Sequence, residues 1–177
     1  MLLGIGMETQ ACALPPQALL GRYCGDGDYT DCFVVEATGP ISLTGYVQAF
    51  YTSWLFKLER LVLALAARPS SDLQAMNLAA GKGSVFAAWE VEARAVDQLL
   101  MRDITGRTRS WFMVEQTADI TRLYFGSAVT ASRRSAAEHP AIPAGYRALV
   151  GLHKLYSRAL LACAHRRLQQ HAEVVSQ

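Results

Sequence analysis

The amino-acid sequence predicts an α+β fold in which an antiparallel β-sheet packs against a long C-terminal helix. Three observations predict it: apolar residues recur at helical spacing after Ser42, the period changes to two at Val85, and helical spacing returns from Pro143 to Leu168. Period-two segments joined by short turns pair as antiparallel neighbours. The middle segment therefore predicts a meander of four strands, with helices before and after it.

Length and composition indicate one globular domain. The chain has 177 residues, of which 51% are hydrophobic and 18% are charged, which is enough to bury a core. We expect an N-terminal arm at residues 1–30, the folded domain at 31–170 and a frayed tail at 171–177. The formal net charge of +2 is too small to indicate a nucleic-acid partner.

Four cysteines, Cys12, Cys24, Cys32 and Cys163, form no C-x-x-C pair and no zinc pattern with histidine. We therefore expect no metal and no other cofactor, and mostly buried free thiols in a reducing cytoplasm. The alternative is a disulfide between Cys24 and Cys32, which are close enough in sequence to close a short loop. The sequence has no clean apolar span of about twenty residues and no basic region at its start, so it predicts neither a membrane span nor a signal peptide.

The first predicted strand is Cys32–Ala37, which is short and contains β-branched residues. A helical insert follows over Ser42–Ala80, and Ser42 is placed to cap its first helix. Ser53 is a point at which the insert divides. Ser71 has capping-box spacing with the glutamine three residues later, and Gly81 suits the end of the helix that follows.

The meander opens with "VFAAWEVEAR", in which small or apolar residues alternate with charged ones: Ala87, Trp89, Val91 and Ala93 against Glu90, Glu92 and Arg94. A turn at Thr105-Gly106 pairs Arg102 with Arg109, and a turn centred on Thr117-Ala118 pairs Phe112 with Leu123. A bulge near Ala95-Val96 is needed to bring Glu90 opposite Arg102. Both later hairpins assign the same sets to two faces: Leu99, Met101, Ser110, Phe112, Val114, Leu123 and Phe125 on one, and Arg102, Arg109, Trp111, Arg122 and Tyr124 on the other.

The arginine-rich stretch "RDITGRTRSWFMVE", residues 102–115, is either a phosphate-binding loop or a hairpin. The register places its arginines at a turn and on an outer face beside Glu90 and Glu92, which favours the hairpin. A nucleic-acid site would need more basic charge and exposed rings.

The segment from Pro143 to Leu168 predicts a long amphipathic helix. One face collects Tyr146, Leu149, Leu152, Tyr156, Leu160 and Cys163, and the opposite side carries Arg147, Lys154, Arg158 and His165. His153 falls inside the apolar arc. A histidine there is usually a hydrogen-bonded core residue, and otherwise a ligand-binding or catalytic group.

This order of elements, together with the phrases "FAAWEVEARAVDQLLMRD", "GRTRSWFMVE" and "TRLYFGSAV", resembles the helix-grip fold of the START/Bet v 1-like (SRPBCC) superfamily, including its bacterial members. The resemblance covers about residues 31–170. It implies a curved sheet wrapped around the C-terminal helix, with a cavity between them. The sequence departs from the pattern in having fewer strands than larger members and a bulky helical insert after the first strand.

The lining of the implied cavity would come from the inner face of the sheet and the apolar face of the helix. The candidates are Trp89, Val91, Met101, Ser110, Phe112, Leu123 and Phe125, with Leu149, His153, Tyr156 and Leu160. An apolar concave wall bearing few polar groups suits a hydrophobic small molecule. The alternative is that these side chains simply fill the core.

Candidates for catalysis are few. Asp103, Ser110 and His153 would supply acid–base chemistry if the fold brings them together. Asp103 has an alternative role as the cap of the hairpin turn. Glu90 and Glu92 are two residues apart on an outer face, where carboxylates are usually solvated.

Three functions therefore compete. The first, and our expectation, is a non-enzymatic protein that binds a hydrophobic, lipid- or polyketide-like small molecule. The second is an enzyme of the cyclase or hydratase kind that uses the inner polar residues. The third is a structural or interaction protein acting as a homodimer, in which Trp111 and Tyr124, or the N-terminal arm, form an apolar patch that another chain covers.

Overall fold

The computed structural model describes residues 9–25, 29–65, 67–130 and 144–175, with side chains described for 151–170 of the last range. The described strands form one antiparallel sheet in the order β1-β2-β7-β6-β5-β4-β3. Their bounds are β1 Gln10–Ala11, β2 Tyr29–Thr38, β3 Val85–Phe86, β4 Trp89–Arg94, β5 Gln98–Asp103, β6 Thr108–Gln116 and β7 Ile120–Val129. The predicted first strand lies within β2, and the four-strand meander is β4 to β7. The short strands β1 and β3 were not predicted.

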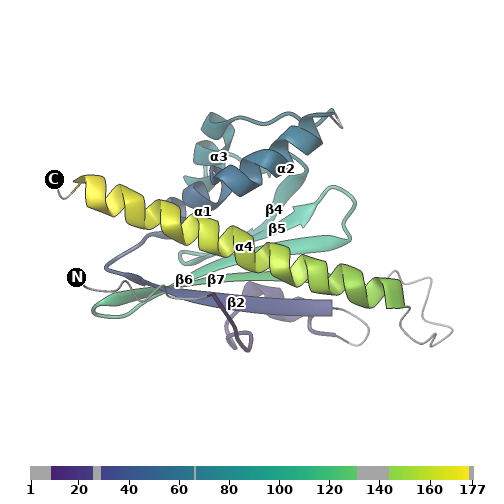
Figure 1. Ribbon diagram of the computed structural model, residues 1–177, viewed down its shortest axis with the longest axis horizontal. Helices are drawn as coiled ribbons and strands as arrows, with labels where there is room; N and C mark the ends of the chain where they lie inside the picture. The colour runs from purple at the N-terminus through teal and green to yellow at the C-terminus, as the bar shows by residue number, and fades with distance from the viewer. Residues whose placement is uncertain (1–8, 26–28, 66, 131–143, 176–177) are drawn as a thin grey trace.

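Helices α1 (Leu43–Tyr51), α2 (Trp54–Leu65) and α3 (Asp72–Ala79) lie between β2 and β3, and α4 (Ala144–Val175) follows the sheet. Figure 1 shows α4 crossing one face of the sheet, with α1, α2 and α3 grouped beside it. We call the face that α1 and α4 contact the inner face. The 3₁₀ helix η1 (Leu19–Tyr23) packs against β5, β6 and β7 from the other, outer face. The predicted α+β class, the helical insert and the long C-terminal helix are confirmed.

Local sequence signals explain where the inserted helices begin and end. The hydroxyl of Ser42 accepts a hydrogen bond from the backbone N–H of Gly45 at 3.1 Å, so it caps α1 as predicted. Ser53 lies between α1 and α2, and Ser71 forms the predicted capping box at the start of α3. Gly81 has a φ of 73° just after α3, a backbone conformation that glycine adopts without strain.

The register of the sheet agrees with the prediction at one hairpin and differs at the next. Arg102 lies opposite Arg109 as predicted, but Phe112 lies opposite Phe125 and not Leu123. The turn after β6 is longer than two residues, because the pairing ends at Gln116 and Thr121. A shift of two residues leaves every side chain on its predicted face, so the two sets of inner and outer residues remain correct.

The predicted bulge is present, but it lies earlier than expected, between Val91 and Ala93. It brings Glu90 opposite Arg102. It also reverses the faces of the residues that follow, so Ala93 packs in the outer cluster instead of joining Trp89 and Val91. The predicted alternation is therefore wrong after Val91.

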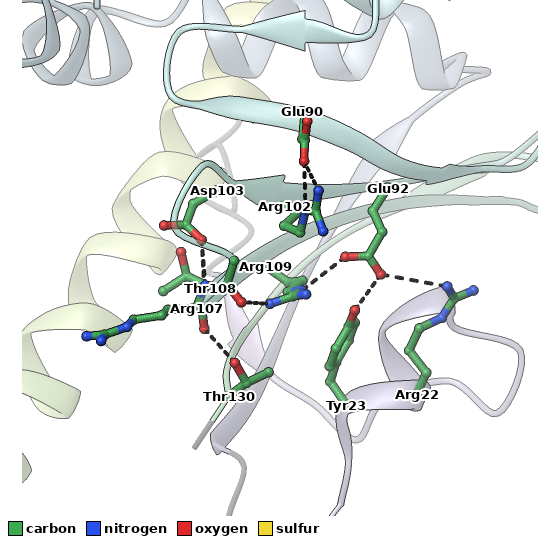
Figure 2. Close-up of polar contacts among 11 residues, drawn as sticks. Arg22, Tyr23, Glu90, Glu92, Arg102, Asp103, Arg107, Thr108, Arg109 and Thr130 are labelled. Atoms are coloured by element: carbon green, nitrogen blue, oxygen red, sulfur yellow. Dashed lines mark hydrogen bonds and ion pairs between the residues drawn. The ribbon is translucent and has the colours of Figure 1, made fainter. Parts of the chain in front are cut away.

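The arginine-rich stretch is a hairpin, as predicted (Figure 2). The carboxylate of Asp103 accepts hydrogen bonds from the backbone N–H groups of Thr105, Arg107 and Thr108 and so closes the turn. Arg102 forms an exposed ion pair with Glu90. Arg109, in contrast, is buried, which the sequence did not indicate.

The N-terminal arm covers the side chain of Arg109. The guanidinium of Arg109 stacks 4.4 Å from the centre of the Tyr23 ring in the arm, and its Nε lies 3.0 Å from Oε2 of Glu92 on β4 (Figure 2). The hydroxyl of Tyr23 donates to the same carboxylate, and Arg22 lies 3.7 Å from it. These contacts hold η1 against the outer face.

The arm also covers the residues that we expected to form an exposed patch. Trp111 is fully buried and Tyr124 is 8% exposed, and Ala18 and Leu20 of the arm pack in the same cluster. The indole N–H of Trp111 donates to Gln98 Oε1 at 2.9 Å. The expectation of an apolar patch at Trp111 and Tyr124 is wrong, because the chain's own arm covers both rings.

The buried stripe of α4 differs from the predicted face. Ser157, Leu160, Leu161, Ala164 and His165 are buried, whereas Leu152 is 64% exposed. These buried positions follow i, i+3, i+4 spacing, but three of them are small or polar. Counting apolar residues therefore identified Leu160 and Tyr156 correctly but included the exposed Leu152 and placed His165 on the solvent side. Among the described residues, no helix combines the length and apolar character needed to cross a membrane.

Candidate functional site

A cavity of about 240 Å³ lies between the inner face of the sheet and the helices α1, α2 and α4. Its wall is formed by residues from β4, β6, β7 and these three helices: Phe50, Tyr51, Phe56, Glu59, Trp89, Thr108, Arg109, Ser110, Phe125, Ser127, His153, Tyr156, Ser157 and Leu160. Six of these side chains are aromatic. The cavity is therefore mostly apolar, with a few polar groups.

Aromatic packing around the break between α1 and α2 forms one side of the wall. The ring centres of Phe50 and Phe125 are 4.8 Å apart, and those of Tyr51 and Phe56 are also 4.8 Å apart. Phe50 in turn meets Phe112 edge-on at 4.8 Å. These distances are typical of stabilising aromatic pairs. The rings are held by one another and by the core behind them.

A chain of polar contacts joins β2, β7 and α4 at the cavity. Ser127 Oγ lies 2.6 Å from Asp31 Oδ1 and 2.6 Å from His153 Nε2. The backbone N–H of Ser127 also donates to Asp31 Oδ1, at 3.0 Å, and the hydroxyl of Tyr29 donates to Oδ2 at 2.9 Å. The carboxylate of Asp31 is thus surrounded by donors, and its side chain is only 5% exposed.

This arrangement contains the residue types of a serine hydrolase but not their geometry. In a catalytic triad the carboxylate orients the histidine through Nδ1, and Nε2 faces the serine. Here Asp31 accepts a hydrogen bond from the Ser127 hydroxyl. The imidazole atom that lies near the Asp31 carboxylate is Nε2 of His153, 3.7 Å from Oδ2. With its proton donated to Asp31, the Ser127 hydroxyl accepts from His153. The chain therefore positions His153 at the cavity and does not activate Ser127 as a nucleophile.

A second polar pair faces the cavity from the helices. The hydroxyl of Tyr156 on α4 donates a hydrogen bond to Oε2 of Glu59 on α2. Burial raises the pKa of the Glu59 carboxyl, and the Tyr156 hydrogen bond opposes that shift. Burial and the neighbouring Glu59 carboxylate also raise the pKa of Tyr156, so its hydroxyl keeps its proton and remains a donor.

The structure brings some of the predicted lining residues together and excludes others. Trp89, Ser110, Phe125, His153, Tyr156 and Leu160 line the cavity. Met101, Phe112 and Leu123 are fully buried in the core behind it, and Val91 packs against that core. Leu149 belongs to α4, but its side chain lies outside the described residues. For Met101, Phe112 and Leu123, core filling was the correct interpretation.

Of the three predicted catalytic candidates, Ser110 and His153 reach the cavity and Asp103 does not line it. Asp103 caps the hairpin through three backbone hydrogen bonds. Those bonds and the hydroxyl of Thr105 lower the pKa of its carboxyl, against the effect of partial burial. A carboxylate held in this way is a structural group.

Sequence reasoning missed Asp31, Glu59 and Ser127, although each carried a signal. Ser127 continues the inward alternation of Leu123 and Phe125 by one step, and Asp31 extends that of β2 in the same way. Glu59 is three residues after Phe56, the buried residue of α2, so the two share a helix face. The predicted first strand began at Cys32, one residue after Asp31, and the inner face of the last strand was assigned only as far as Phe125. The helical insert was interpreted from its apolar residues alone, which left out Glu59.

A wider hollow of about 690 Å³ lies where β2 meets α1 and the end of α4. The described residues that form its wall carry no ionisable side chain; they are Ala37, Thr38, Gly39, Pro40, Ile41, Ser42, Gly45, Leu168 and Gln169. The cavity under α4 is the better candidate site, because it combines an apolar wall with convergent polar groups.

Comparison with known proteins does not name a family. No family model matches the chain, and no curated protein is significantly similar to it.

Proposed function

We propose that the protein binds a small, mostly apolar molecule in the cavity between the sheet and α4. The observation that carries the proposal is the wall itself, which combines six aromatic rings, Tyr156 among them, with two polar pairs, Ser127–His153 and Glu59–Tyr156. In sites of this kind an apolar wall supplies most of the affinity for the ligand, and a few polar groups determine how the ligand is oriented. The volume of about 240 Å³ favours a compact molecule over a long acyl chain.

The architecture supports the same proposal. An antiparallel sheet packed against a long C-terminal helix, with a cavity between them, is what the resemblance to the START/Bet v 1-like superfamily implies. We infer that the chain is a helix-grip protein of this kind. The alternative of a cyclase or hydratase is less well supported, because Asp103 is held by the hairpin and the Ser127 hydroxyl is held by Asp31.

Native mass spectrometry beside the same sample after denaturation tests the proposal. A ligand retained in the native spectrum and lost on denaturation is the expected result. Ser110→Leu extends an apolar side chain into the cavity, and we expect it to abolish retention. Arg102→Leu, at an exposed outer position on the neighbouring strand, is the matched control and should retain the ligand. Equal retention by both variants would place the ligand elsewhere and refute the proposal that it binds in the cavity.

A second candidate function, homodimerisation, is favoured by α2. Five of its apolar side chains are more than half exposed: Trp54, Leu58, Leu61, Val62 and Leu65. Their spacing places them along one stripe of the helix. An exposed apolar stripe of this kind marks an interaction surface, and a second copy of α2 would cover it symmetrically.

The same native mass spectra report the oligomeric state. A dimer that becomes a monomer in Leu61→Lys is the expected result for this second function. Val85→Lys, at an exposed apolar position outside α2, is the control and should leave the dimer intact. A wild-type monomer at all concentrations tested would refute the dimer without affecting the proposed ligand.

A further inference from the structure

Glu59 has no positively charged partner in the part of the chain that the structure describes. It lines the cavity, and its hydrogen bond comes from the neutral hydroxyl of Tyr156. Among the residues that the structure describes, no lysine, arginine or histidine lies within ion-pair distance of it. A buried carboxylate is costly unless a positive charge or several donors compensate it.

The nearest cations in the sequence are engaged elsewhere. Lys57 Nζ lies 2.8 Å from Asp72 Oδ2, and Arg60 pairs with Asp72 Oδ1 at 2.5 Å and donates to Ser70. Both therefore point to α3 and the segment that precedes it. Arg109 contributes to the cavity wall, but its guanidinium is bound to Glu92. The described part of the protein supplies no countercharge to Glu59.

The rest of the wall suits a positive charge. Tyr51, Phe56, Trp89, Phe125 and Tyr156 line the same cavity as Glu59. The faces of aromatic rings attract cations, most strongly where water is excluded. Together, a partly buried carboxylate and several aromatic rings are the elements from which proteins build sites for ammonium groups.

We propose that the cavity binds a small organic cation, a primary or substituted ammonium group on an apolar body, with the ammonium paired to Glu59. This inference rests on the proposed binding function and specifies the ligand class. The ammonium supplies the missing countercharge and donates to the carboxylate. The apolar body fills the space between the rings that line the cavity.

The charge selectivity follows from the same contacts. A neutral molecule of the same shape would gain the ring contacts but leave Glu59 unpaired. An anion would in addition meet a carboxylate of like charge in a desolvated site. The order of affinity is therefore cation, then neutral isostere, then anion.

Three probes of nearly the same shape test this order: phenethylammonium, 2-phenylethanol and phenylacetate. Their binding to the full chain is measured by isothermal titration calorimetry, with ring-proton NMR of the probe for weak complexes. We expect phenethylammonium to bind at least about tenfold more tightly than 2-phenylethanol, and phenylacetate to be the weakest; tenfold corresponds to about 1.4 kcal/mol.

Glu59→Gln keeps an oxygen for the Tyr156 hydroxyl but removes the charge. We expect it to bind phenethylammonium and 2-phenylethanol equally, within about twofold. Glu90→Gln, which removes an exposed carboxylate outside the cavity, is the control and should keep the preference for the cation. Equal binding of the cation and the alcohol to the wild type would overturn the cation inference and leave the binding function standing. Failure of all three probes, with no ligand retained in native spectra, would overturn both.

A separate observation concerns two cysteines at the edge of the sheet. Cys12 follows β1 directly and lies opposite Cys32 on β2, with its backbone N–H 3.0 Å from the Cys32 carbonyl oxygen. The two Sγ atoms are 3.3 Å apart. Cys24, which we considered as the partner of Cys32, is exposed and has Thr30 as its neighbour, at 3.8 Å. The alternative Cys24–Cys32 disulfide is therefore wrong.

We infer that oxidation by a peroxide converts Cys12 and Cys32 into an intramolecular disulfide. The half-buried Cys12 thiolate attacks a peroxide oxygen, the O–O bond breaks, and Cys12 becomes a sulfenic acid with release of water. The Cys32 sulfur then attacks the Cys12 sulfur, an S–S bond forms, and a second water leaves. Two thiols are oxidised and one hydrogen peroxide is reduced. The hydrogen bond between the two thiols, which lowers the pKa of Cys12, supports this order of events.

The disulfide would join the N-terminal arm covalently to the sheet. Treatment with hydrogen peroxide, followed by peptide mapping without reduction, should give a Cys12–Cys32 linked peptide and a mass loss of two hydrogens. Cys24→Ser is the control and should form the same link, whereas Cys32→Ser should leave Cys12 at the sulfenic acid. A link through Cys24, a disulfide between two chains, or Cys12 oxidised further in the wild type without a link would overturn the inference.

Discussion

Ser127 on β7 lies 2.6 Å from Nε2 of His153 on α4, and this contact joins the sheet to the helix that crosses it. The same hydroxyl lies 2.6 Å from Asp31 on β2. One side chain therefore satisfies a buried carboxylate and orients an imidazole at the cavity. The contact is directional, so it fixes the position of α4 more specifically than apolar packing alone.

Removing the Ser127 hydroxyl should lower stability. Ser127→Ala leaves Asp31 with fewer donors and removes the hydroxyl that contacts His153, and we expect a loss of about 1–3 kcal/mol in chemical denaturation. Ser110→Ala is the matched control, because Ser110 lines the same cavity and its side chain makes no hydrogen bond among the described residues. It should change stability by less than about 0.5 kcal/mol. Equal effects would mean that the contact is not stabilising.

The sheet was predictable from the sequence because its pattern is redundant. Leu99, Met101 and Phe112 share a face in both hairpins, and a turn of the wrong length shifts the register by two without changing that face. The bulge between Val91 and Ala93 was anticipated only approximately. Its position depends on how the neighbouring strand is paired, and alternation along one strand does not show this.

The site was less predictable, because its polar residues are defined by contacts between distant segments. Asp31 and Ser127 are 96 residues apart, and Glu59 and Tyr156 are 97 apart. No local spacing links either pair. The coverage of Trp111 by Leu20 is of the same kind: the sheet's outer face looks exposed until the arm is placed on it.

Removing the Arg109 guanidinium should loosen the arm. Arg109→Met leaves the carboxylate of Glu92 partly buried and without its closest charged partner, and we expect a loss of about 1–3 kcal/mol. Hydrogen exchange should also become faster in η1, since the stacking on Tyr23 is lost.

Arg102→Met is the control for this change, because Arg102 lies directly opposite Arg109 but its ion pair with Glu90 is exposed. Exposed pairs contribute little, so stability and exchange in η1 should stay close to wild type. An Arg109 variant that behaves like the Arg102 variant would show that the guanidinium does not anchor the arm.

Glu59 should make stability depend on pH. Burial raises the pKa of its carboxyl in the folded state, so the folded state holds the proton more tightly than the unfolded chain. Stability that Glu59 contributes is therefore present below the unfolded pKa of about 4.3 and is lost as the pH rises through the raised value. The expected result is that Glu59→Gln melts at a higher temperature than wild type at about pH 8 and at the same temperature at about pH 4.

The control for the pH series is Glu90→Gln, which removes an exposed outer carboxylate. Its melting temperature should follow that of the wild type at every pH. A Glu59→Gln variant that is less stable than wild type at about pH 8 would contradict the prediction and indicate that the carboxylate is stabilised in the folded protein without a ligand.

Gly126 on β7 is required by the packing of the arm. A Cβ atom there would lie 2.8 Å from the backbone oxygen of Asp31, 2.9 Å from Leu20 and 3.0 Å from Trp111. The first contact is with backbone, which cannot move away easily. Gly126→Ala should therefore lower the free energy of unfolding by about 1–3 kcal/mol and shift the fluorescence of Trp111 as Leu20 is displaced.

Gly151→Ala is the control, since a Cβ atom at this position of α4 would have no neighbouring atom within 4 Å. Alanine is favoured there by about 0.5–1 kcal/mol, so the two substitutions should change the unfolding midpoint in opposite directions. A neutral Gly126→Ala would show that the arm does not pack closely on β7.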